Sequence, residues 1–361
     1  MKHILFFVNS MQPSGGIERV IATLANKLSA FYEITVLVKD EPVSFYKLNG
    51  SIKIKSINKP LTFNMHSRFS RFFKAINNVL SSTNILKSHL KANSYDYYYV
   101  AHPLSVLEFK LAGIDFDKLI ISEHAARTHY NAVYRYIKKL LYKKCKTYVV
   151  PTTSDTIDYI KLDKFPAVNI PHFRSELAYS KAELTNKTVL NIGRFTNDKQ
   201  QLLLLKIWKE ICGVHKYSEW KLNIVGQGEL QEELVEYIKQ NKLDENVNLL
   251  PPIANVAEYY LGSTVFLLTS ISEGYGMVLL EAISFGVPCI SFDCPSGPKD
   301  IITDGYNGYL VPLNDVKLFT AKLIHLLNNH SVIEELGNNA FQSSFNWNDE
   351  LILKKWTNVF N

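Results

Sequence analysis

Short apolar runs alternate with longer amphipathic segments along the whole chain. The runs are rich in β-branched and aromatic residues and are bounded by turn formers, which is typical of strands. The segments between them have the apolar spacing of helices. Regular alternation of the two predicts parallel sheets covered by helices, so we expect an α/β protein.

Strand-like runs occur in both halves of the chain. In the first half they are His3–Asn9, Glu33–Val38, Ile52–Ile57, Tyr97–Val100, Leu119–Ser122, Thr147–Val150 and Val168–Ile170. In the second half they are Thr188–Ile192, Lys221–Val225, Asn248–Leu250, Val265–Thr269, Pro288–Phe292 and Gly308–Val311. Between the two sets lies Pro171–Lys187, a segment rich in polar residues and turn formers that we interpret as a linker.

The pattern predicts two doubly wound, Rossmann-like domains that face one another across a cleft. Their expected bounds are residues 1–171 and 172–345, and residues 346–361 are expected to form a final amphipathic helix. The apolar positions of that helix recur at helical spacing: Leu351, Leu353, Trp356 and Phe360. At 361 residues the chain is long enough for each domain to have its own core.

The composition is that of a soluble globular protein, with 47% hydrophobic and 20% charged residues. No apolar run reaches the roughly 18 residues that span a bilayer, and the first strand-like run is too short for a signal peptide. The four cysteines lack the spacing of a zinc site and are too few for a disulfide scaffold. We therefore expect reduced thiols in a cytoplasmic protein.

Positive charge is concentrated in the first half. Residues 1–171 contain 24 Lys and Arg but 12 Asp and Glu, whereas the remaining residues contain 16 and 22. Two stretches, residues 42–95 and 124–154, contain no acidic residue at all. A solvated helix face normally mixes both signs, so this bias predicts an anionic surface as a partner.

Within the first of these stretches, Arg68–Lys74 has aromatic residues between its cations on a predicted helix. This suits a helix that lies among lipid headgroups, and the sequence contains no nucleic-acid-binding motif. We therefore expect an anionic membrane surface, and no nucleic acid, as the partner. The alternative, compatible with the first, is that the apolar residues face the domain core and only the cations are solvated.

The segment Ser272-Glu-Gly-Tyr-Gly-Met-Val-Leu-Leu-Glu-Ala282 carries the most chemical information. Glu273 follows a strand, Glu281 lies about two helical turns further on, and the amino terminus of the helix falls between them. Helix amino termini bind anions, and ligands of open α/β sheets bind beyond the carboxyl ends of the strands. Two carboxylates beside an anion site predict a ligand that has both hydroxyls and phosphates, such as a nucleotide sugar.

Two other loops suit phosphates. Arg194 and Lys199 follow the first strand of the second half, where two cations suit a diphosphate leaving group, although surface salt bridges explain this loop equally well in isolation. Gly15 and Gly16 precede the first predicted helix and allow a phosphate to approach the backbone. A strand-to-helix turn often needs glycine anyway.

Three more segments are weaker candidates. Gly226 and Gly228 form a turn that fits under a nucleobase, but the third glycine of a dinucleotide site is missing. Glu123 and His124 end a strand of the first half and are expected to face the cleft, where His124 contacts substrate or has a structural role. Asp115-Phe-Asp117 precedes a strand, so we interpret it as a turn and not as a metal site.

Taken in order, these motifs resemble those of glycosyltransferase family 4, whose members are retaining enzymes with the GT-B fold. The resemblance covers nearly the whole chain and is strongest over residues 188–312. The matching motifs are Gly193-Arg-x-x-x-x-Lys199, Val225-Gly-x-Gly228, Ser272-Glu-Gly-Tyr-Gly276 with Glu281, and Asp304-Gly-x-Asn-Gly308. Two positions depart from the pattern: Gln200 replaces a glycine, and Ile170-Pro-His-Phe173 replaces Ile-Pro-Asn-Gly.

The resemblance implies two sets of site residues. The catalytic set is Glu273, His124, Arg194 and Lys199. The nucleotide-sugar-binding set is Gly15, Gly16, Arg194, Lys199, Gly226, Gly276, Met277, Val278 and Glu281.

The resemblance also implies what individual residues would do. Arg194 and Lys199 would hold the diphosphate, Glu281 the ribose hydroxyls, and Glu273 and His124 the transferred sugar from two sides. The leaving diphosphate would help to deprotonate the acceptor, without an enzyme nucleophile. No metal or other cofactor would be needed, and the last helix would cross back to the first domain.

The segment Asp293-Cys-Pro-Ser-Gly-Pro298 is similar to that of bacterial enzymes that build O-antigen, capsule or other lipid-linked glycans. The resemblance thus implies transfer of a hexose or N-acetylhexosamine from a UDP-sugar to an undecaprenyl-diphosphate-linked saccharide, on the inner face of the cytoplasmic membrane. Alternatives are a GDP- or other nucleotide-sugar donor, a soluble acceptor, or, from a different class, an NAD-dependent or purely nucleotide-binding Rossmann protein.

Overall fold

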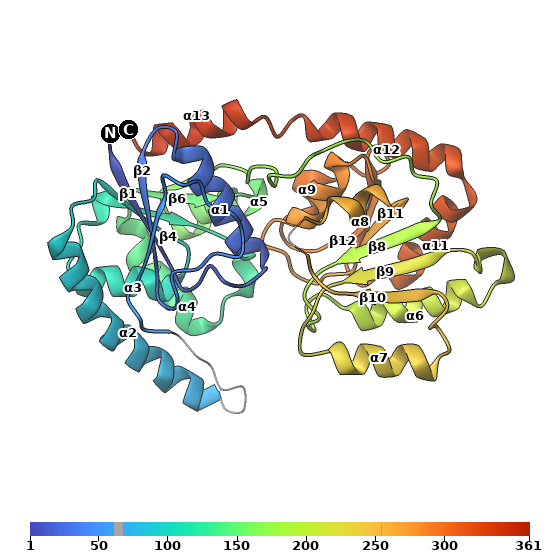
Figure 1. Ribbon diagram of the computed structural model, residues 1–361, viewed down its shortest axis with the longest axis horizontal. Coiled ribbons are helices and arrows are strands. Elements are labelled where there is room, and N and C mark those ends of the chain that lie inside the picture. Colours follow the sequence, from blue (N-terminus) through green and yellow to red (C-terminus); the bar gives the residue numbers. More distant parts are fainter. Residues whose placement is uncertain (61–67, 254) are drawn as a thin grey trace. The chain divides into compact units, whose positions relative to one another are not determined.

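The computed structural model describes residues 1–60, 68–253 and 255–361, and divides the chain into two compact units (Figure 1). The first unit contains Met1–Phe173 together with Asp349–Asn361. The second unit contains Arg174–Asn348. Each unit has one parallel sheet with helices packed on it.

The sheet of the first unit has seven strands in the order β3-β2-β1-β4-β5-β6-β7, all parallel. The strands are β1 His3–Val8, β2 Glu33–Val38, β3 Lys53–Ser56, β4 Tyr97–Val100, β5 Leu119–Ser122, β6 Thr147–Val150 and β7 Ala167–Asn169. The α-helices between them are α1 Gly16–Leu28, α2 Arg68–Ala92, α3 Pro103–Ala112, α4 Ala132–Leu141 and α5 Thr153–Asp158. The strand order reverses between β1 and β4, as in Rossmann folds.

The sheet of the second unit has six parallel strands in the order β10-β9-β8-β11-β12-β13. The strands are β8 Thr188–Ile192, β9 Lys221–Val225, β10 Val247–Leu250, β11 Val265–Leu268, β12 Cys289–Asp293 and β13 Gly308–Pro312. The α-helices are α6 Gln201–Cys212, α7 Gln231–Gln240, α8 Ala257–Leu261, α9 Met277–Ser284, α10 Pro298–Ile301, α11 Val316–Asn328 and α12 His330–Ser344. This is again the Rossmann order, and it reverses between β8 and β11.

The last helix, α13 (Asp349–Val359), packs on the first unit. Lys27 Nζ lies 2.7 Å from Asp349 Oδ2, and Lys2 Nζ donates to the carbonyl oxygen of Phe360 over 2.7 Å. The ring of Phe360 also contacts those of Tyr32 and Tyr97, at centroid distances of 5.4 and 5.7 Å. Helix α13 and Phe360 are thus held by residues of the first unit.

The predicted α/β fold with two doubly wound sheets is confirmed. Every predicted strand is present, and no end differs from the prediction by more than one residue. Asp115 caps the short 3-10 helix Phe116–Lys118, and its carboxylate accepts from the amide of Asp117 over 3.0 Å. Asp115-Phe-Asp117 is therefore a turn, as predicted.

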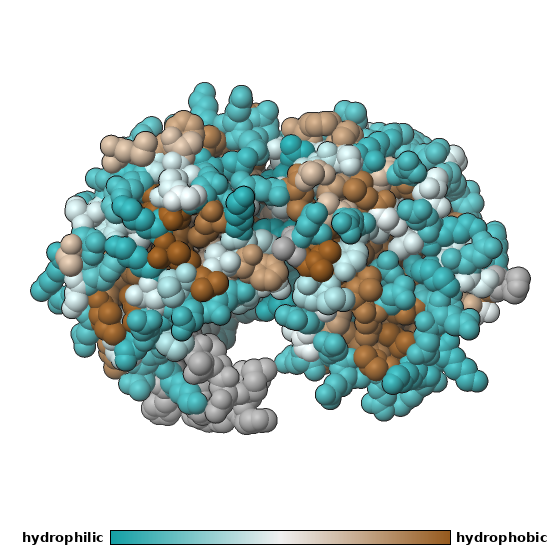
Figure 2. All heavy atoms as spheres, in the orientation of Figure 1, coloured by the Kyte–Doolittle hydropathy of each residue, from teal (hydrophilic) through white to brown (hydrophobic). Residues whose placement is uncertain are grey.

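Polar side chains cover much of the face shown in Figure 2, with smaller hydrophobic areas between them. No helix in the described ranges is both long and apolar enough to cross a membrane. The side chains of residues 68–73, on which the predicted membrane contact of Arg68 and Arg71 depends, lie outside the described part of the structure.

Candidate active site

Lys199 and Glu273 form an ion pair at the carboxyl edge of the second unit's sheet. Lys199 lies on the loop after β8 and Glu273 on the loop after β11, and Lys199 Nζ is 2.7 Å from Glu273 Oε1. Both side chains are largely buried, with 16% and 11% of their surface exposed. Asp198 Oδ2 is 3.7 Å from the same ammonium group. Two motifs that are distant in sequence thus meet where the strand order reverses.

Backbone hydrogen bonds hold these two loops together. The amide of Ile271 donates to the carbonyl oxygen of Asp198 over 2.9 Å, and the hydroxyl of Thr269 donates to that of Lys199 over 3.0 Å. Because the backbone on both sides of the ion pair is fixed, little conformational entropy is lost when the pair engages a ligand.

Glu281 lies within α9 and is almost fully buried, with 2% of its surface exposed. One carboxylate oxygen accepts from the hydroxyl of Ser175, and the other accepts from the hydroxyl of Tyr260 over 2.8 Å. These hydrogen bonds fix the orientation of the carboxylate, and its contact with ribose hydroxyls stays a prediction.

The amino terminus of α9 lies between the two carboxylates along the chain. Gly276 caps the helix with φ 89°, a left-handed conformation that favours glycine. Met277 and Val278 form the first turn, whose amides have no carbonyl partner inside the helix. The helix amino terminus lies where the sequence predicted it, and anion binding there stays a prediction.

The loop after β12 supports the Glu273 loop. Gly297 has φ 97°, and a Cβ atom there would lie 2.3 Å from the carbonyl oxygen of Tyr275. The hydroxyl of Tyr275 in turn accepts from the indole N–H of Trp347 over 2.6 Å. The Pro-Ser-Gly-Pro segment thus fixes the position of the loop that carries Glu273.

Arg194 lies on the same loop as Lys199, but its side chain is exposed. Its carbonyl oxygen accepts from Gln201 Nε2 over 2.9 Å and from the amide of Thr196 over 2.9 Å. The structure thus fixes the backbone of Arg194 and leaves the guanidinium at the surface. Its role in diphosphate binding stays a prediction.

Gly226 and Gly228 are required by close packing. A Cβ atom on Gly226 would lie 2.0 Å from the carbonyl oxygen of Gly193, and one on Gly228 would lie 2.4 Å from that of Phe195. The loop after β9 therefore lies directly against the loop that carries Arg194. This packing accounts for both glycines, and a nucleobase contact at Gly226 stays a prediction.

Gly15 caps α1 and Gly16 is its first residue. The carboxylate of Glu18 folds back over Gly15, because Glu18 Oε2 lies 2.3 Å from where a Cβ atom would stand. A carboxylate is itself a favourable partner for a helix amino terminus. A phosphate at Gly15 and Gly16, which stays a prediction, would have to displace it.

His124 follows β5 in the first unit. Its Nε2 is 3.0 Å from the hydroxyl of Tyr99, and its ring stacks on that of His172, with centroids 5.3 Å apart and planes 12° apart. Burial lowers the pKa of His124 to about 4, against a smaller opposing effect of Glu123. The imidazole is therefore neutral at pH 7, with one donor and one acceptor nitrogen. His172 was not predicted as a neighbour of His124, although Ile170-Pro-His-Phe173 departs from the family pattern.

The prediction that Glu123 faces the cleft beside His124 is wrong. Its carboxylate is buried and accepts from Lys138 Nζ over 2.5 Å and from the hydroxyls of Tyr130, Tyr159 and Tyr148. Burial alone would raise the pKa of Glu123, but Lys138 and the tyrosine hydroxyls outweigh it and hold the pKa at about 2. Residues from α4, β6 and the segment after α5 turn this carboxylate inward.

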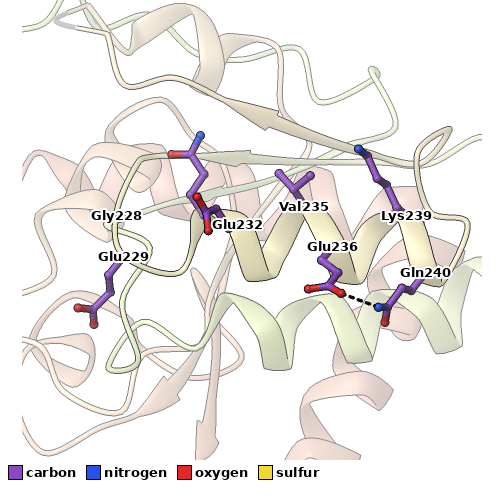
Figure 3. A pocket seen from close by; sticks show the side chains of 8 residues that line it. Gly228, Glu229, Glu232, Val235, Glu236, Lys239 and Gln240 are labelled. Atoms are coloured by element: carbon purple, nitrogen blue, oxygen red, sulfur yellow. Dashed lines mark hydrogen bonds between the residues drawn. The ribbon is translucent and has the colours of Figure 1, made fainter.

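A surface groove runs along α7 (Figure 3). Its lining residues are Gly228, Glu229, Gln231, Glu232, Val235, Glu236, Lys239 and Gln240. Three of them are carboxylates, which repel a diphosphate, and neither Lys199 nor Glu273 contributes. The groove is therefore not the candidate site.

The chain has two Rossmann-like units, and the second carries an ion pair, a buried carboxylate and a helix amino terminus along a single sheet edge. This is the fold of glycosyltransferases of the GT-B class. Residues 174–343 match the family model described as "Glycosyl transferases group 1". The chain is 31% identical to the amylovoran biosynthesis glycosyltransferase AmsD of Erwinia amylovora, over all of both proteins. It therefore belongs to the group 1 glycosyltransferases.

Two further comparisons agree. The chain is 30% identical to the Campylobacter jejuni protein named "GalNAc-alpha-(1->4)-GalNAc-alpha-(1->3)-diNAcBac-PP-undecaprenol alpha-1,4-N-acetyl-D-galactosaminyltransferase", over 99% of this chain and 97% of that one. A solved structure of S. aureus TarM in complex with Fondaparinux, alpha-GlcNAc-glycerol and UDP is similar over the whole of both chains, with a TM-score of 0.82 and 17% identity. At that identity the likeness shows the fold alone.

Proposed function

We propose that the protein is a retaining glycosyltransferase of family 4 that transfers a hexose or N-acetylhexosamine from a UDP-sugar to an undecaprenyl-diphosphate-linked saccharide. The observation that carries the proposal is the Lys199–Glu273 ion pair, on the sheet edge where α9 begins. A cation, a carboxylate and a helix amino terminus match the diphosphate and the sugar hydroxyls of one ligand.

In the proposed reaction, the bond between the sugar C1 and the diphosphate oxygen breaks, and the acceptor hydroxyl oxygen bonds to C1 on the same face. The acceptor proton passes to the leaving diphosphate, and no metal takes part. Negative charge grows on the diphosphate in the transition state. Lys199 and the amides of Met277 and Val278 stabilise it, because they are oriented before the reaction begins, and Arg194 adds a second positive charge from the same loop as Lys199.

The carboxylates and the histidine recognise hydroxyl groups. Glu273 accepts from a hydroxyl of the transferred sugar while Lys199 keeps two further N–H donors for the diphosphate. Glu281, whose carboxylate is held in place by the hydroxyls of Ser175 and Tyr260, accepts from the ribose hydroxyls. His124 contacts the sugar as a neutral imidazole.

The choice of donor and acceptor rests on relatives. TarM was solved with UDP, and the Campylobacter jejuni relative is named for an undecaprenol-linked substrate. A GDP- or other nucleotide-sugar donor and a soluble acceptor remain alternatives within the class. An NAD-dependent protein is excluded by the family match. We further propose that the enzyme works on the inner face of the cytoplasmic membrane, a location that an acceptor held in the bilayer supports.

A ligand-stabilisation experiment tests the proposal. UDP at about 100 times its dissociation constant is expected to add roughly 2.7 kcal/mol to the free energy of unfolding, and GDP and NAD much less. Transfer to an undecaprenyl-diphosphate saccharide should persist in EDTA, and NMR of the first-formed product should show the anomeric configuration of the donor. Stabilisation by GDP alone would move the donor assignment, and an inverted product would overturn retention.

A further inference from the structure

Helix α4 has an apolar side that is not covered by the rest of its unit. Val133, Tyr136 and Leu140 are 46%, 68% and 57% exposed. They recur at helical spacing along one side of the helix, whereas Lys138 and Leu141 on the other side are buried. The helix is therefore anchored by one face and presents a second apolar face outward.

Cations surround this outward face. Arg135, Lys139 and Lys143 are exposed along the same helix and the 3-10 turn that follows it. No acidic residue occurs between His124 and Ser154, so no neighbour along this stretch neutralises them. Apolar side chains flanked by cations are typical of a helix that lies in the interface of an anionic bilayer.

The two acid-free stretches of the sequence meet in the fold. Val79 of α2, Leu104 of α3 and Tyr134 and Ile137 of α4 belong to one apolar cluster. Helix α2 contributes three more exposed cations, Lys74, Lys87 and Lys91. Positive charge from residues 74–143 thus gathers on neighbouring helices.

We propose that the outward face of α4 inserts into the headgroup region of an anionic bilayer, with Val133, Tyr136 and Leu140 reaching the acyl boundary. The proposal deepens the proposed function, on which it rests, because it names the surface that meets the membrane holding the acceptor. A second copy of the chain is a poorer occupant. A twofold contact would bring Arg135, Lys139 and Lys143 against the same cations of the copy.

Flotation of the full chain with vesicles tests this without any transfer reaction. Vesicles of phosphatidylcholine with phosphatidylglycerol should carry the protein, and vesicles of phosphatidylcholine alone should carry it much less. Val133→Ser/Tyr136→Ser/Leu140→Ser should lower the partition coefficient roughly tenfold or more. Arg135→Gln/Lys139→Gln/Lys143→Gln should lower it by about fivefold for each charge, roughly a hundredfold in all.

Matched controls come from the second unit, which has exposed residues of the same kinds. Lys206→Gln/Lys239→Gln/Lys317→Gln removes three exposed cations, and Val214→Ser/Leu318→Ser removes exposed apolar groups. These variants should bind vesicles like the natural chain. Circular dichroism and the melting temperature verify that every variant is folded.

The proposal is overturned if both α4 variants float like the natural chain, or if the control variants lose as much flotation as the α4 variants. It is also overturned if the α4 variants still float but lose self-association in sedimentation, because the face would then bind a second copy. Failure of the proposed function is distinguishable, because it would appear as absent transfer to a water-soluble acceptor while flotation persists. Normal transfer to that acceptor by the α4 variants, with slow transfer to the lipid-linked one in vesicles, would support both.

Discussion

Lys199 and Glu273 are 74 residues apart in the sequence, yet Lys199 Nζ lies 2.7 Å from Glu273 Oε1. The pair unites the two motifs on which the candidate site depends. A largely buried ion pair contributes little to the free energy of folding, because desolvation opposes the Coulombic attraction. In the proposed function the pair serves binding instead: Glu273 binds sugar hydroxyls of the donor and Lys199 binds its diphosphate.

We predict that Lys199→Ala, Arg194→Ala and Glu273→Gln each lower kcat by two orders of magnitude or more, since each removes a charge or an acceptor that the proposed transition state needs. Steady-state transfer rates measure the effect. Lys206→Ala, which removes an exposed cation from α6, is the control and should leave kcat unchanged. Near-normal rates in both cation variants would remove the diphosphate assignment.

Glu281 should act mainly in donor binding. Glu281→Gln is expected to raise the KM for the nucleotide sugar about tenfold or more, because an amide offers fewer acceptor positions to ribose. Tyr260→Phe removes one hydrogen bond to the carboxylate and should lower the free energy of unfolding by about 1 kcal/mol. Calorimetric titration with UDP separates the effect on donor binding from the effect on stability. An unchanged dissociation constant in Glu281→Gln argues against a ribose contact.

Two glycines should be intolerant of any side chain. Gly228→Ala and Gly297→Ala place a Cβ atom 2.4 Å from the carbonyl oxygen of Phe195 and 2.3 Å from that of Tyr275. Each is expected to lower the free energy of unfolding by about 1–3 kcal/mol or more. Gly50→Ala, where no atom lies within 4 Å of the new Cβ, is the control. Urea unfolding measures all three, and equal stabilities would show that these loops relax.

The buried Glu123 should make the first unit sensitive to acid. Its pKa is about 2 in the folded protein and near 4.5 in the unfolded chain, so folding is favoured by the ionised form. The contribution, on the order of 3 kcal/mol, is complete above pH 4.5 and is lost as the pH falls toward 2. Urea unfolding between pH 5 and 3 should show this loss, and Glu123→Leu/Lys138→Met should show a shallower one. Equal slopes would mean that other carboxylates dominate.

His124 should stay neutral well below its usual range. Because burial lowers its pKa to about 4, its ring resonances in NMR should not shift between pH 7 and 5.5, while those of exposed histidines move. His124→Gln assigns the signal. His172→Phe keeps a stacking ring and should preserve most activity, whereas His172→Ala should lower it. A midpoint near 6.5 for His124 would contradict the burial argument.

The fold could be predicted because its signals are local. Each strand is a short apolar run between turn formers, and the alternation with helices indicates parallel sheets. The site was predictable where a motif fixes its own backbone, as with Gly276 at the start of α9. The orientation of Glu123 was not, because Lys138, Tyr148 and Tyr159 reach it only after the sheet has formed. The stacking of His172 on His124 depends on the same kind of distant contact.

Helix α13 belongs to the same unit as β1, and Lys2 Nζ donates a hydrogen bond to the carbonyl oxygen of Phe360. The second unit is in consequence an insertion within the first. During translation, residues 174–348 leave the ribosome before Phe360, whose ring contacts those of Tyr32 and Tyr97, has been made. Part of the apolar surface of the nascent first unit is therefore uncovered until residues 349–360 have been made.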